Sequence, residues 1–292
     1  MMTIYLLFRR NIRIFFRDRM NIFFALLSSL ILFVLFAMFL GKMQVDIINS
    51  NYHNLNQAYV HGYVQSWVFG GITMVTTFTA GLGALTVFVE DSGTGRFKDF
   101  LVSPIRRWQL VLGYLLSSFS VAVIMSVLVL IVGQIYLKLS GYNTLDRTQL
   151  LEVLGLIILF SAVFSSISSF FISFIKTSGA FSSLSTIIGT LIGFFAAIYV
   201  PIGRLPSGVA SFLNYLPFAQ TAALMRQPYT TKYVANLSHG NIAIQNTLNT
   251  TYGNNIEFGA RSLKITEMVI YLVVIAIIFF GLSAFRIGKR IN

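Results

Sequence analysis

The feature that most constrains this 292-residue sequence is a series of apolar runs, each long enough to cross a lipid bilayer. The hydrocarbon core of a bilayer is about 30 Å thick, and a helix of about 20 apolar residues spans it. Six such runs lie near residues 22–41, 65–89, 110–137, 150–175, 178–200 and 266–286. Because lipid offers backbone groups no hydrogen-bond partners, each run is expected to be helical. The sequence therefore predicts an all-α integral membrane protein with six transmembrane helices, which form a single transmembrane domain over residues 1–292.

The composition agrees with a lipid environment. Hydrophobic residues make up 56% of the chain and charged residues only 10%, whereas about a quarter of a soluble domain is charged. The formal net charge is +12, but the basic residues gather at the ends of the apolar runs. We interpret this charge as a topology signal and a contact with anionic membrane lipids, and we expect no nucleic-acid partner. Cysteine is absent, so disulfides and thiolate metal sites are excluded.

The basic clusters predict the orientation of the spans, because short segments rich in Lys and Arg stay in the cytoplasm. Clusters precede the first run and follow the second and sixth, at Arg9, Arg10, Arg13, Arg17 and Arg19, at Arg96, Lys98, Arg106 and Arg107, and at Arg286, Lys289 and Arg290. Both termini are therefore expected in the cytoplasm, with the chain in the plasma membrane of a bacterial cell. The first run is too long for a signal peptide and lacks a clear cleavage site, so we expect it to be retained.

Residues 3–20 are predicted to form an amphipathic helix at the inner membrane surface. At helical spacing one face carries the apolar residues Ile4, Phe8, Ile12, Phe15 and Phe16. The neighbouring face carries the basic residues Arg9, Arg10, Arg13 and Arg17. The helix either anchors the chain or also docks a cytoplasmic partner, and the sequence leaves both possibilities open.

Ionisable side chains are rare inside the predicted spans. Glu152 and Glu267 are the only acidic residues, each at the edge of a run, and no histidine lies in any run. Proton relays and intramembrane catalysis usually need such groups, so both are poorly supported. The serines of the fourth run resemble the small hydroxyl residues that let membrane helices pack closely. We expect no catalytic residue and no metal site.

A phosphate-binding loop of the GxxxxGK[ST] type is also missing from the sequence. Such a loop cradles the phosphates of a nucleotide with its backbone amides. The chain is therefore not expected to be an enzyme or to hold a cofactor of its own. If it moves a solute actively, the energy must come from another protein.

The segment between the second and third runs, residues 90–109, reads EDSGTGRFKDFLVSPIRRWQ. Glu90 and Asp91 end the apolar run, and the glycines that follow permit a sharp turn. A short helix is predicted from Arg96 to Leu101, before Pro104 interrupts it. Taken from its residues alone, this segment is a solvated connector whose charges set the topology.

Residues 201–265 form a long segment that we place outside the cell. Its apolar stretches Val209–Leu216 and Ala219–Met225 are separated by Pro217, and each is too short to cross the bilayer. They predict short re-entrant or interfacial helices. Residues Asn236–Asn255 are polar, without a helical apolar period, and predict an exposed loop.

Two motifs resemble ABC transporter permeases of the type-2 exporter class. The first comprises the acidic pair and glycines of residues 90–95, a basic residue, Leu-x-Ser-Pro-Ile-Arg-Arg-Trp-Gln-Leu at 101–110 and Gly113. The second comprises Pro206-Ser207, the stretch Leu213–Phe218 and the later Arg226. The order of elements also resembles that family, from an amphipathic first helix through six spans to a basic tail.

The resemblance implies a permease subunit that pairs with a second copy or a homologous permease and with separate ATP-binding cassette subunits, which bind ATP and Mg. It also implies that residues 90–109 contain a coupling helix that docks on the ATPase, with Glu90, Asp91, Arg96, Phe97, Leu101 and Arg106 as contacts. Lys176, between spans four and five, would be a second contact. The external helices would cap the pathway, with Pro206, Pro217 and Arg226 at this external gate.

The expected function is thus the export of an amphiphilic substrate such as a drug, a lipid-linked glycan or a hydrophobic peptide. Few fixed charges and many aromatic and hydroxyl side chains in the spans suit such a cargo. Two other classes remain open on the residues alone. One is an energy-independent channel or scramblase, and the other is a membrane-embedded lipid enzyme.

Overall fold

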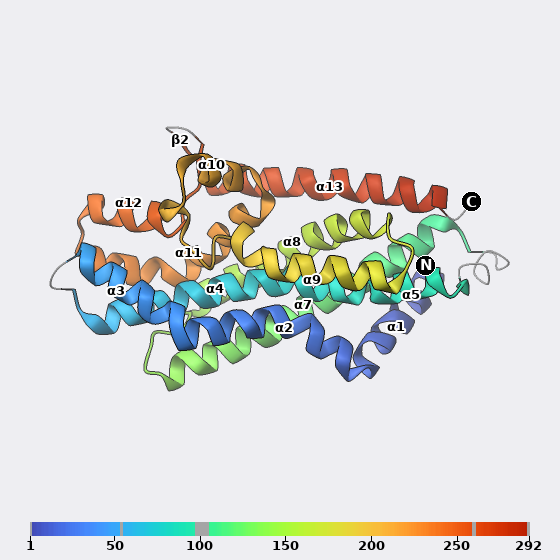
Figure 1. Ribbon diagram of the computed structural model, residues 1–292, viewed down its shortest axis with the longest axis horizontal. Coiled ribbons are helices and arrows are strands. Elements are labelled where there is room, and N and C mark those ends of the chain that lie inside the picture. The colour runs from blue at the N-terminus through green and yellow to red at the C-terminus, as the bar shows by residue number, and fades with distance from the viewer. Residues whose placement is uncertain (1, 53–54, 97–104, 259–260, 291–292) are drawn as a thin grey trace.

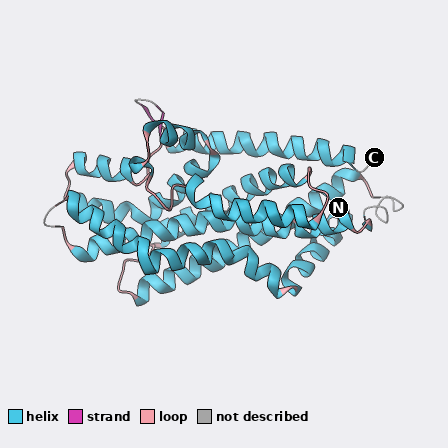
Figure 2. Ribbon diagram, in the orientation of Figure 1, coloured by secondary structure: helices cyan, strands magenta, loops and turns pink. Residues whose placement is uncertain are grey.

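The computed structural model describes residues 2–52, 55–96, 105–258 and 261–290, most of which are helical, as Figure 2 shows. The helices are α1 (Met2–Arg17), α2 (Arg19–Leu35), a π-helical turn (Phe36–Leu40), α3 (Gly41–Asn51), α4 (Gln57–Ala84), α5 (Thr86–Gly93), α7 (Arg107–Leu139), α8 (Arg147–Ile172), α9 (Ser178–Phe195), a 3-10 turn (Ile202–Arg204), α10 (Ser207–Tyr215), α11 (Pro217–Ser238), α12 (Ile242–Thr251) and α13 (Ile265–Arg290). Two short antiparallel strands, β1 (Glu257–Phe258) and β2 (Arg261–Ser262), precede α13.

Within the described residues, six helical stretches are long and apolar enough to cross a membrane, which confirms the predicted number of spans. They are Arg19–Asn51, Gln57–Gly93, Trp108–Leu139, Arg147–Ile172, Ser178–Phe195 and Ile265–Ile287. In Figure 1 these helices lie roughly side by side. The start of α1, the helix α5 and the end of α13 share one end of the bundle, called here the terminal end. Helices α3 and α12 lie at the other, called here the opposite end.

Helix α4 forms the centre of the bundle, with α2, α7, α8 and α11 packed against it. In the most apolar part of its span, 89% of the residues are buried within the protein. The corresponding share is 17% in α9 and 17% in α13. Its threonines Thr73, Thr76 and Thr79 donate to carbonyl oxygens one turn earlier, so none leaves an unpaired hydroxyl in the core. Gly62 lets α11 approach closely, because a Cβ there would lie 2.3 Å from the Tyr233 ring.

The first span is longer than predicted. The sequence predicts a span over residues 22–41, whereas the structure has one continuous helical stretch from Arg19 to Asn51. In α3 the side chains of Gln44, Val45 and Ile48 are buried, and α3 packs against α4. These tertiary contacts continue the helix through a stretch whose composition alone indicates a loop.

The fifth span is shorter than predicted, because α9 ends at Phe195 and not near residue 200. The chain turns at Ala197, which takes a left-handed backbone conformation with φ of 48°. An alanine pays steric strain there, so surrounding contacts must stabilise the turn. The carbonyl oxygens of Ala196 and Ala197 both accept hydrogen bonds from Arg226, a residue of α11.

The segment 201–265 is more ordered than predicted. Helix α10 corresponds to the first expected short helix, but α11 has 22 residues and most of them are buried against the bundle. The predicted loop 236–255 is wrong, since the end of α11 and the whole of α12 occupy it. Asn241 caps α12 by accepting from the amides of Ala243 and Ile244. Asparagine is common in helix caps as well as in loops, so a polar composition does not distinguish a capped helix from a loop.

Candidate functional site

A fully buried carboxylate lies at the terminal end of the bundle. Asp91 is on α5, and its side chain is 0% exposed. Its Oδ2 accepts from Arg10 Nη1 at 2.6 Å and from the Tyr114 hydroxyl at 2.5 Å. Its Oδ1 accepts from Arg10 Nη2 at 2.8 Å and from Arg96 Nη1 at 3.2 Å. This Asp91 cluster therefore joins α1, α5, α7 and the start of the 90–109 segment.

The chemistry of the Asp91 cluster follows from its burial. An ionised carboxylate away from water is stable only when both oxygens are hydrogen-bonded and its charge is balanced. Arg10 meets both needs with a bidentate contact, and its hydrogen bond with Asp91 raises the pKa of the guanidinium above its ordinary value. Arg96 is 54% exposed, so its contact is the more easily exchanged of the two.

The position of Arg10 depends on close packing between α1 and α7. Leu7 of α1 lies against Gly113, where an added Cβ would come within 2.8 Å of the Leu7 Cβ. One turn further along, Asn11 donates from Nδ2 to Ser117 Oγ at 3.3 Å. The buried stripe of α1 is thus Leu7, Asn11 and Phe15, which places Arg10 beside α5.

This packing corrects one prediction for the first helix. Arg9, Arg13 and Arg17 are exposed, as a surface-binding face requires. Arg10 instead turns into the protein and pairs with Asp91, so it is not available to lipid phosphates in the same way. Sequence reasoning missed the pairing, because Arg10 and Asp91 are 81 residues apart. It also did not select Tyr114.

The remaining predicted coupling residues lie near the same end. Arg106 precedes α7, where its backbone amide donates to Gln109 Oε1 at 3.0 Å in a helix cap. The exposed Lys176 stands beside the end of α5, since its carbonyl oxygen lies 3.7 Å from the place of a Cβ on Gly93. The structure thus brings the loop before α9 next to the start of the 90–109 segment. Phe97 and Leu101 lie outside the described residues.

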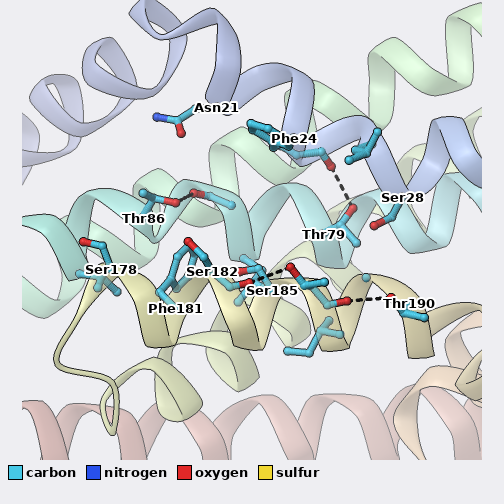
Figure 3. A pocket seen from close by; sticks show the side chains of 18 of the residues that line it. Asn21, Phe24, Ser28, Thr79, Thr86, Ser178, Phe181, Ser182, Ser185 and Thr190 are labelled. Atoms are coloured by element: carbon cyan, nitrogen blue, oxygen red, sulfur yellow. Dashed lines mark hydrogen bonds between the residues drawn. The ribbon is translucent and has the colours of Figure 1, made fainter.

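A cavity with a volume of about 550 Å³ opens between α2, the α4–α5 span and α9. Figure 3 shows hydroxyl side chains from all three walls pointing toward it. The residues with hydroxyl groups that line the cavity are Ser28, Thr79, Thr86, Ser178, Ser182, Ser185, Thr186, Thr190 and Tyr199. Aromatic rings of Phe24 and Phe181 share the lining, and half-buried Glu90 is its one charged side chain. Neutral hydroxyls beside aromatic rings suit an amphiphilic molecule.

The α9 wall of the cavity is unusual for a membrane helix. Helix α9 has the lowest mean hydropathy of the six spans. Only 17% of the residues in its most apolar part are buried within the protein. Ser182 and Thr186 of this wall are exposed. The Ser185 hydroxyl is buried and has no hydrogen-bond partner within the part of the chain that the structure describes. The serines of α8 were noted among the predicted spans, whereas those of α9 were not, although their frequency in the sequence was a usable signal.

A second buried charge lies toward the opposite end, on α11. Arg226 is 1% exposed. Its Nη2 donates to the carbonyl oxygens of Ala196 at 2.9 Å and Ala197 at 3.0 Å, and its Nη1 donates to that of Tyr252 at 3.2 Å. Its guanidinium carbon lies 4.4 Å from the centroid of the Trp67 ring. Arg226 therefore joins α4, α9, α11 and the end of α12 without a carboxylate.

The predicted gate residues differ in exposure and in their place in the helices. Pro206 is exposed and caps α10, whereas Pro217 begins α11 one residue after α10 reaches its cap at Leu216. Proline suits the first turn of a helix because no amide donor is needed there. Arg226 is buried, and its gate assignment stays a prediction. Among the described residues no group of three His, Cys, Asp or Glu side chains could hold a metal ion.

Comparison with known proteins adds to these observations. Residues 42–285 match a family model described as ABC-2 family transporter protein. Comparison with individual curated proteins gives no match. The matched region includes α4 through most of α13 and with them the Asp91 side chain, Arg226 and two of the cavity walls, while α1 and α2 precede it. Six apolar spans, few ionisable groups and a match over most of the sequence lead to one conclusion: the chain is a multi-pass membrane permease that belongs to the ABC-2 transporter family.

Proposed function

We propose that this permease is the membrane subunit of an ATP-driven exporter. Two copies, or one copy and a homologous permease, enclose the translocation pathway. ABC-2 permeases work in general with an ATP-binding cassette partner, and here ATP and Mg²⁺ bind to that partner. The chain itself carries out no covalent chemistry. The terminal end faces the cytoplasm of a bacterial cell, where exposed Arg9, Arg13 and Arg17 meet anionic lipid headgroups.

The observation that carries this proposal is the Asp91 cluster. A force applied to residues 90–109 reaches α5 directly, and through Asp91 it also reaches α1 and α7. The short distance between Gly93 and the Lys176 carbonyl adds the α8–α9 loop to the same end. A partner that binds both loops would therefore move several helices together. Such coupling requires that the partner bind two states of the permease with different affinity.

The cavity between α2, α4–α5 and α9 supports an amphiphilic cargo. Its volume of about 550 Å³ falls within the range of small-molecule sites. Its hydroxyls can bind polar groups of a drug or a glycan, while Phe24 and Phe181 contact apolar parts. The poorly packed α9 wall is available to a second permease subunit. Two cavities brought together would make a larger pathway.

The test uses the permease co-expressed with its ATPase. Replacing Asp91 with Asn keeps the shape of the side chain and removes its charge, so the bidentate contact with Arg10 is weakened. We expect the variant to insert in the membrane and to co-purify with the ATPase, but to lose most permease-stimulated ATP hydrolysis and export. The matched control is Asp18→Asn, because Asp18 is an exposed cap of α2 and Asn also caps helices.

A second variant tests the docking step. Replacing Phe97 and Leu101 with Asp is expected to prevent co-purification of the ATPase while membrane insertion stays normal. Normal export by this double variant would contradict the coupling assignment. Full ATPase stimulation by Asp91→Asn would contradict the role of the Asp91 cluster.

The other classes make a different prediction for the isolated chain. An energy-independent channel or scramblase would move ions or lipids in vesicles that contain only this protein. A membrane-embedded lipid enzyme would turn over a lipid substrate there. Neither activity is expected, because the cavity lining offers no acid and base pair and export depends on the partner. Either activity at a substantial rate would replace the exporter proposal.

A further inference from the structure

The two neighbouring carboxylates near the end of α5 have different surroundings. Asp91 is fully buried and pairs with Arg10 and Arg96. Glu90 is half-buried, and its backbone carbonyl accepts from the amide of Thr94 at 2.9 Å and from its hydroxyl at 2.8 Å. The Glu90 carboxylate itself has no ion-pair or hydrogen-bond partner among the described residues. Its charge is therefore uncompensated within that part of the chain.

Glu90 also contributes to the cavity between α2, the α4–α5 span and α9. Among the described residues that line this cavity, Glu90 alone carries a charge. A carboxylate that is partly removed from water costs free energy unless a cation or hydrogen-bond donors balance it. A cation bound inside the cavity would remove this cost. The cavity wall therefore provides one half of an ion pair.

The charge lies at one end of the cavity. Figure 3 shows Thr86 and Ser178 toward one end and Thr190 toward the other. Glu90 follows Thr86 by one helical turn, on the side away from Thr79, and about 16 Å of helix separates Glu90 from Thr79. The other side chains of the lining are apolar, aromatic, hydroxyl or amide groups. The cavity is thus elongated, with a negative charge at the terminal end and an uncharged lining along the rest of its length.

We propose that this cavity binds amphiphilic molecules that carry a positive charge, and that Glu90 selects them. The inference rests on the proposed exporter function and adds the charge of the cargo. The cationic group of the ligand pairs with Glu90, while its apolar body lies between α2 and α9 against the rings of Phe24 and Phe181. Aromatic rings also attract cations. The buried Ser185 hydroxyl has no partner among the described residues and can bond to a polar group of the ligand.

Ligands of other charge fit the cavity less well. An anionic amphiphile brings a second negative charge next to Glu90. An uncharged glycan can bond to the hydroxyls but leaves the carboxylate without a counter-ion. An inorganic cation would find one carboxylate here, and no group of three metal-binding side chains exists in the described part of the chain. A cation with an apolar body uses both the charge and the rest of the lining.

Two ions of the same shape and opposite charge test the inference. Tetraphenylphosphonium is a lipophilic cation, and tetraphenylborate is the matching anion. Binding of each ion to the full chain is measured by equilibrium dialysis in phosphatidylcholine nanodiscs, and the uptake by empty nanodiscs is subtracted. The assay contains no ATPase, because Glu90 is also a predicted ATPase contact. We expect saturable binding of the cation by the parent chain, and its absence would overturn the inference.

Variants of the lining locate the site and identify its charge. Glu90→Gln keeps the size of the side chain and should weaken binding of the cation about tenfold without weakening binding of the anion. Glu90→Asp keeps the charge and should retain part of the cation binding. Ser182→Trp fills the cavity from an exposed position and should also weaken cation binding. The matched control Glu152→Gln removes an exposed carboxylate outside the cavity and should change neither affinity. Unchanged cation binding in Glu90→Gln or Ser182→Trp would overturn the inference.

Transport measurements with the ATPase separate this inference from the exporter proposal. A chain that exports other molecules with its ATPase, but whose binding of the cation does not depend on Glu90, rejects the cationic cargo and leaves the exporter proposal standing. A chain that binds the cation through Glu90 but shows no ATPase-dependent transport supports the site and rejects the exporter proposal.

Discussion

Two buried charges lie toward opposite ends of the bundle, and the protein stabilises them in different ways. Asp91 at the terminal end is surrounded by cations and a hydroxyl, from Arg10, Arg96 and Tyr114. Arg226 toward the opposite end is held by three carbonyl oxygens and the face of Trp67. Each group holds together helices that are distant in the sequence, but only the first uses charges that water also reaches.

The two buried charges differ in how easily their partners can be exchanged. Arg10 is 30% exposed and Arg96 is 54% exposed, so solvent or a partner can compete for their contacts with Asp91. The partners of Arg226 are backbone carbonyls and a buried ring, which cannot exchange without unfolding the turns that present them. We therefore expect the terminal end to be the adjustable end and the Arg226 group to hold its end rigid.

The largest expected effect on stability comes from removing the Arg226 side chain. Arg226→Met keeps much of the apolar stem but leaves the carbonyl oxygens of Ala196 and Ala197 without their arginine donor, while that of Tyr252 keeps only its hydrogen bond from Trp67 Nε1. We expect a loss of folding free energy on the order of 3 kcal/mol or more, seen as a lower unfolding temperature in detergent. Arg226→Lys should recover only part of it, because an ammonium cannot reach three acceptors and stack on Trp67 together. The control Arg204→Met removes an exposed arginine and should be nearly neutral. Equal stability of the Arg226→Met protein would show that these contacts do not hold α9 and α12.

The next largest effect on stability concerns the ion pair between Arg10 and Asp91. Arg10→Met leaves the buried Asp91 carboxylate with Arg96 and Tyr114 as its side-chain partners among the described residues, and we expect a loss of about 2 kcal/mol. Adding Asp91→Asn removes the charge that Arg10 was balancing, so the double variant should lose less than the sum of the two single variants. The coupling free energy from this cycle is expected to be about 1–3 kcal/mol. Simple additivity would mean that the pair contributes nothing to stability.

A gain is expected where α9 ends. Ala197 has a positive φ, and glycine takes that conformation without steric strain. Ala197→Gly should therefore raise stability by up to about 1 kcal/mol, measured by thermal unfolding. The comparison variant Ala219→Gly lies inside α11 and should lower stability by a similar amount, because glycine weakens helix interiors. A loss of stability in Ala197→Gly would indicate that packing of the Ala197 methyl group stabilises the protein by more than its strained backbone conformation destabilises it.

The smallest effect concerns an exposed charge beside α11. Asp146 caps α8, and hydrogen bonds from the Gln149 amide and the Thr148 hydroxyl, with Lys232 at 3.1 Å, lower its pKa to about 2. An unfolded aspartate has a pKa of about 3.9. The folded value is the lower one, so this stabilisation is complete above about pH 4 and is lost as the pH falls toward about 2. Unfolding temperature against pH should fall toward low pH in the parent chain, and Asp146→Asn, which still caps α8, should show a smaller slope.

Much of the architecture could be predicted without tertiary contacts. Apolar composition is sufficient for a membrane span, since any run of that length must be helical in lipid, and all six runs are found. The boundaries were less predictable. Helix α3 continues because Ile48 and its neighbours pack on α4, and α9 ends early because Arg226 binds the carbonyls at its end. Both causes lie in residues far away along the chain.

The candidate site divides in the same way. Arg10, Asp91 and Arg96 could each be selected from their position at the end of an apolar run, and Arg226 from its motif. Their partners could not be. Tyr114 carries no signal of its own, and the hydroxyls of α9 form a cavity only when α2 and α4 stand beside them.

The sequence by itself determined that this chain is a membrane protein and how many times it crosses the bilayer. It also determined where the charged residues lie along each helix. These properties follow from transfer free energies, which depend on local composition. The tertiary structure decided which charges meet, which helices stop, and where a cavity opens. Those outcomes depend on helices that meet in three dimensions, because a buried charge is stable only beside the particular groups that satisfy it.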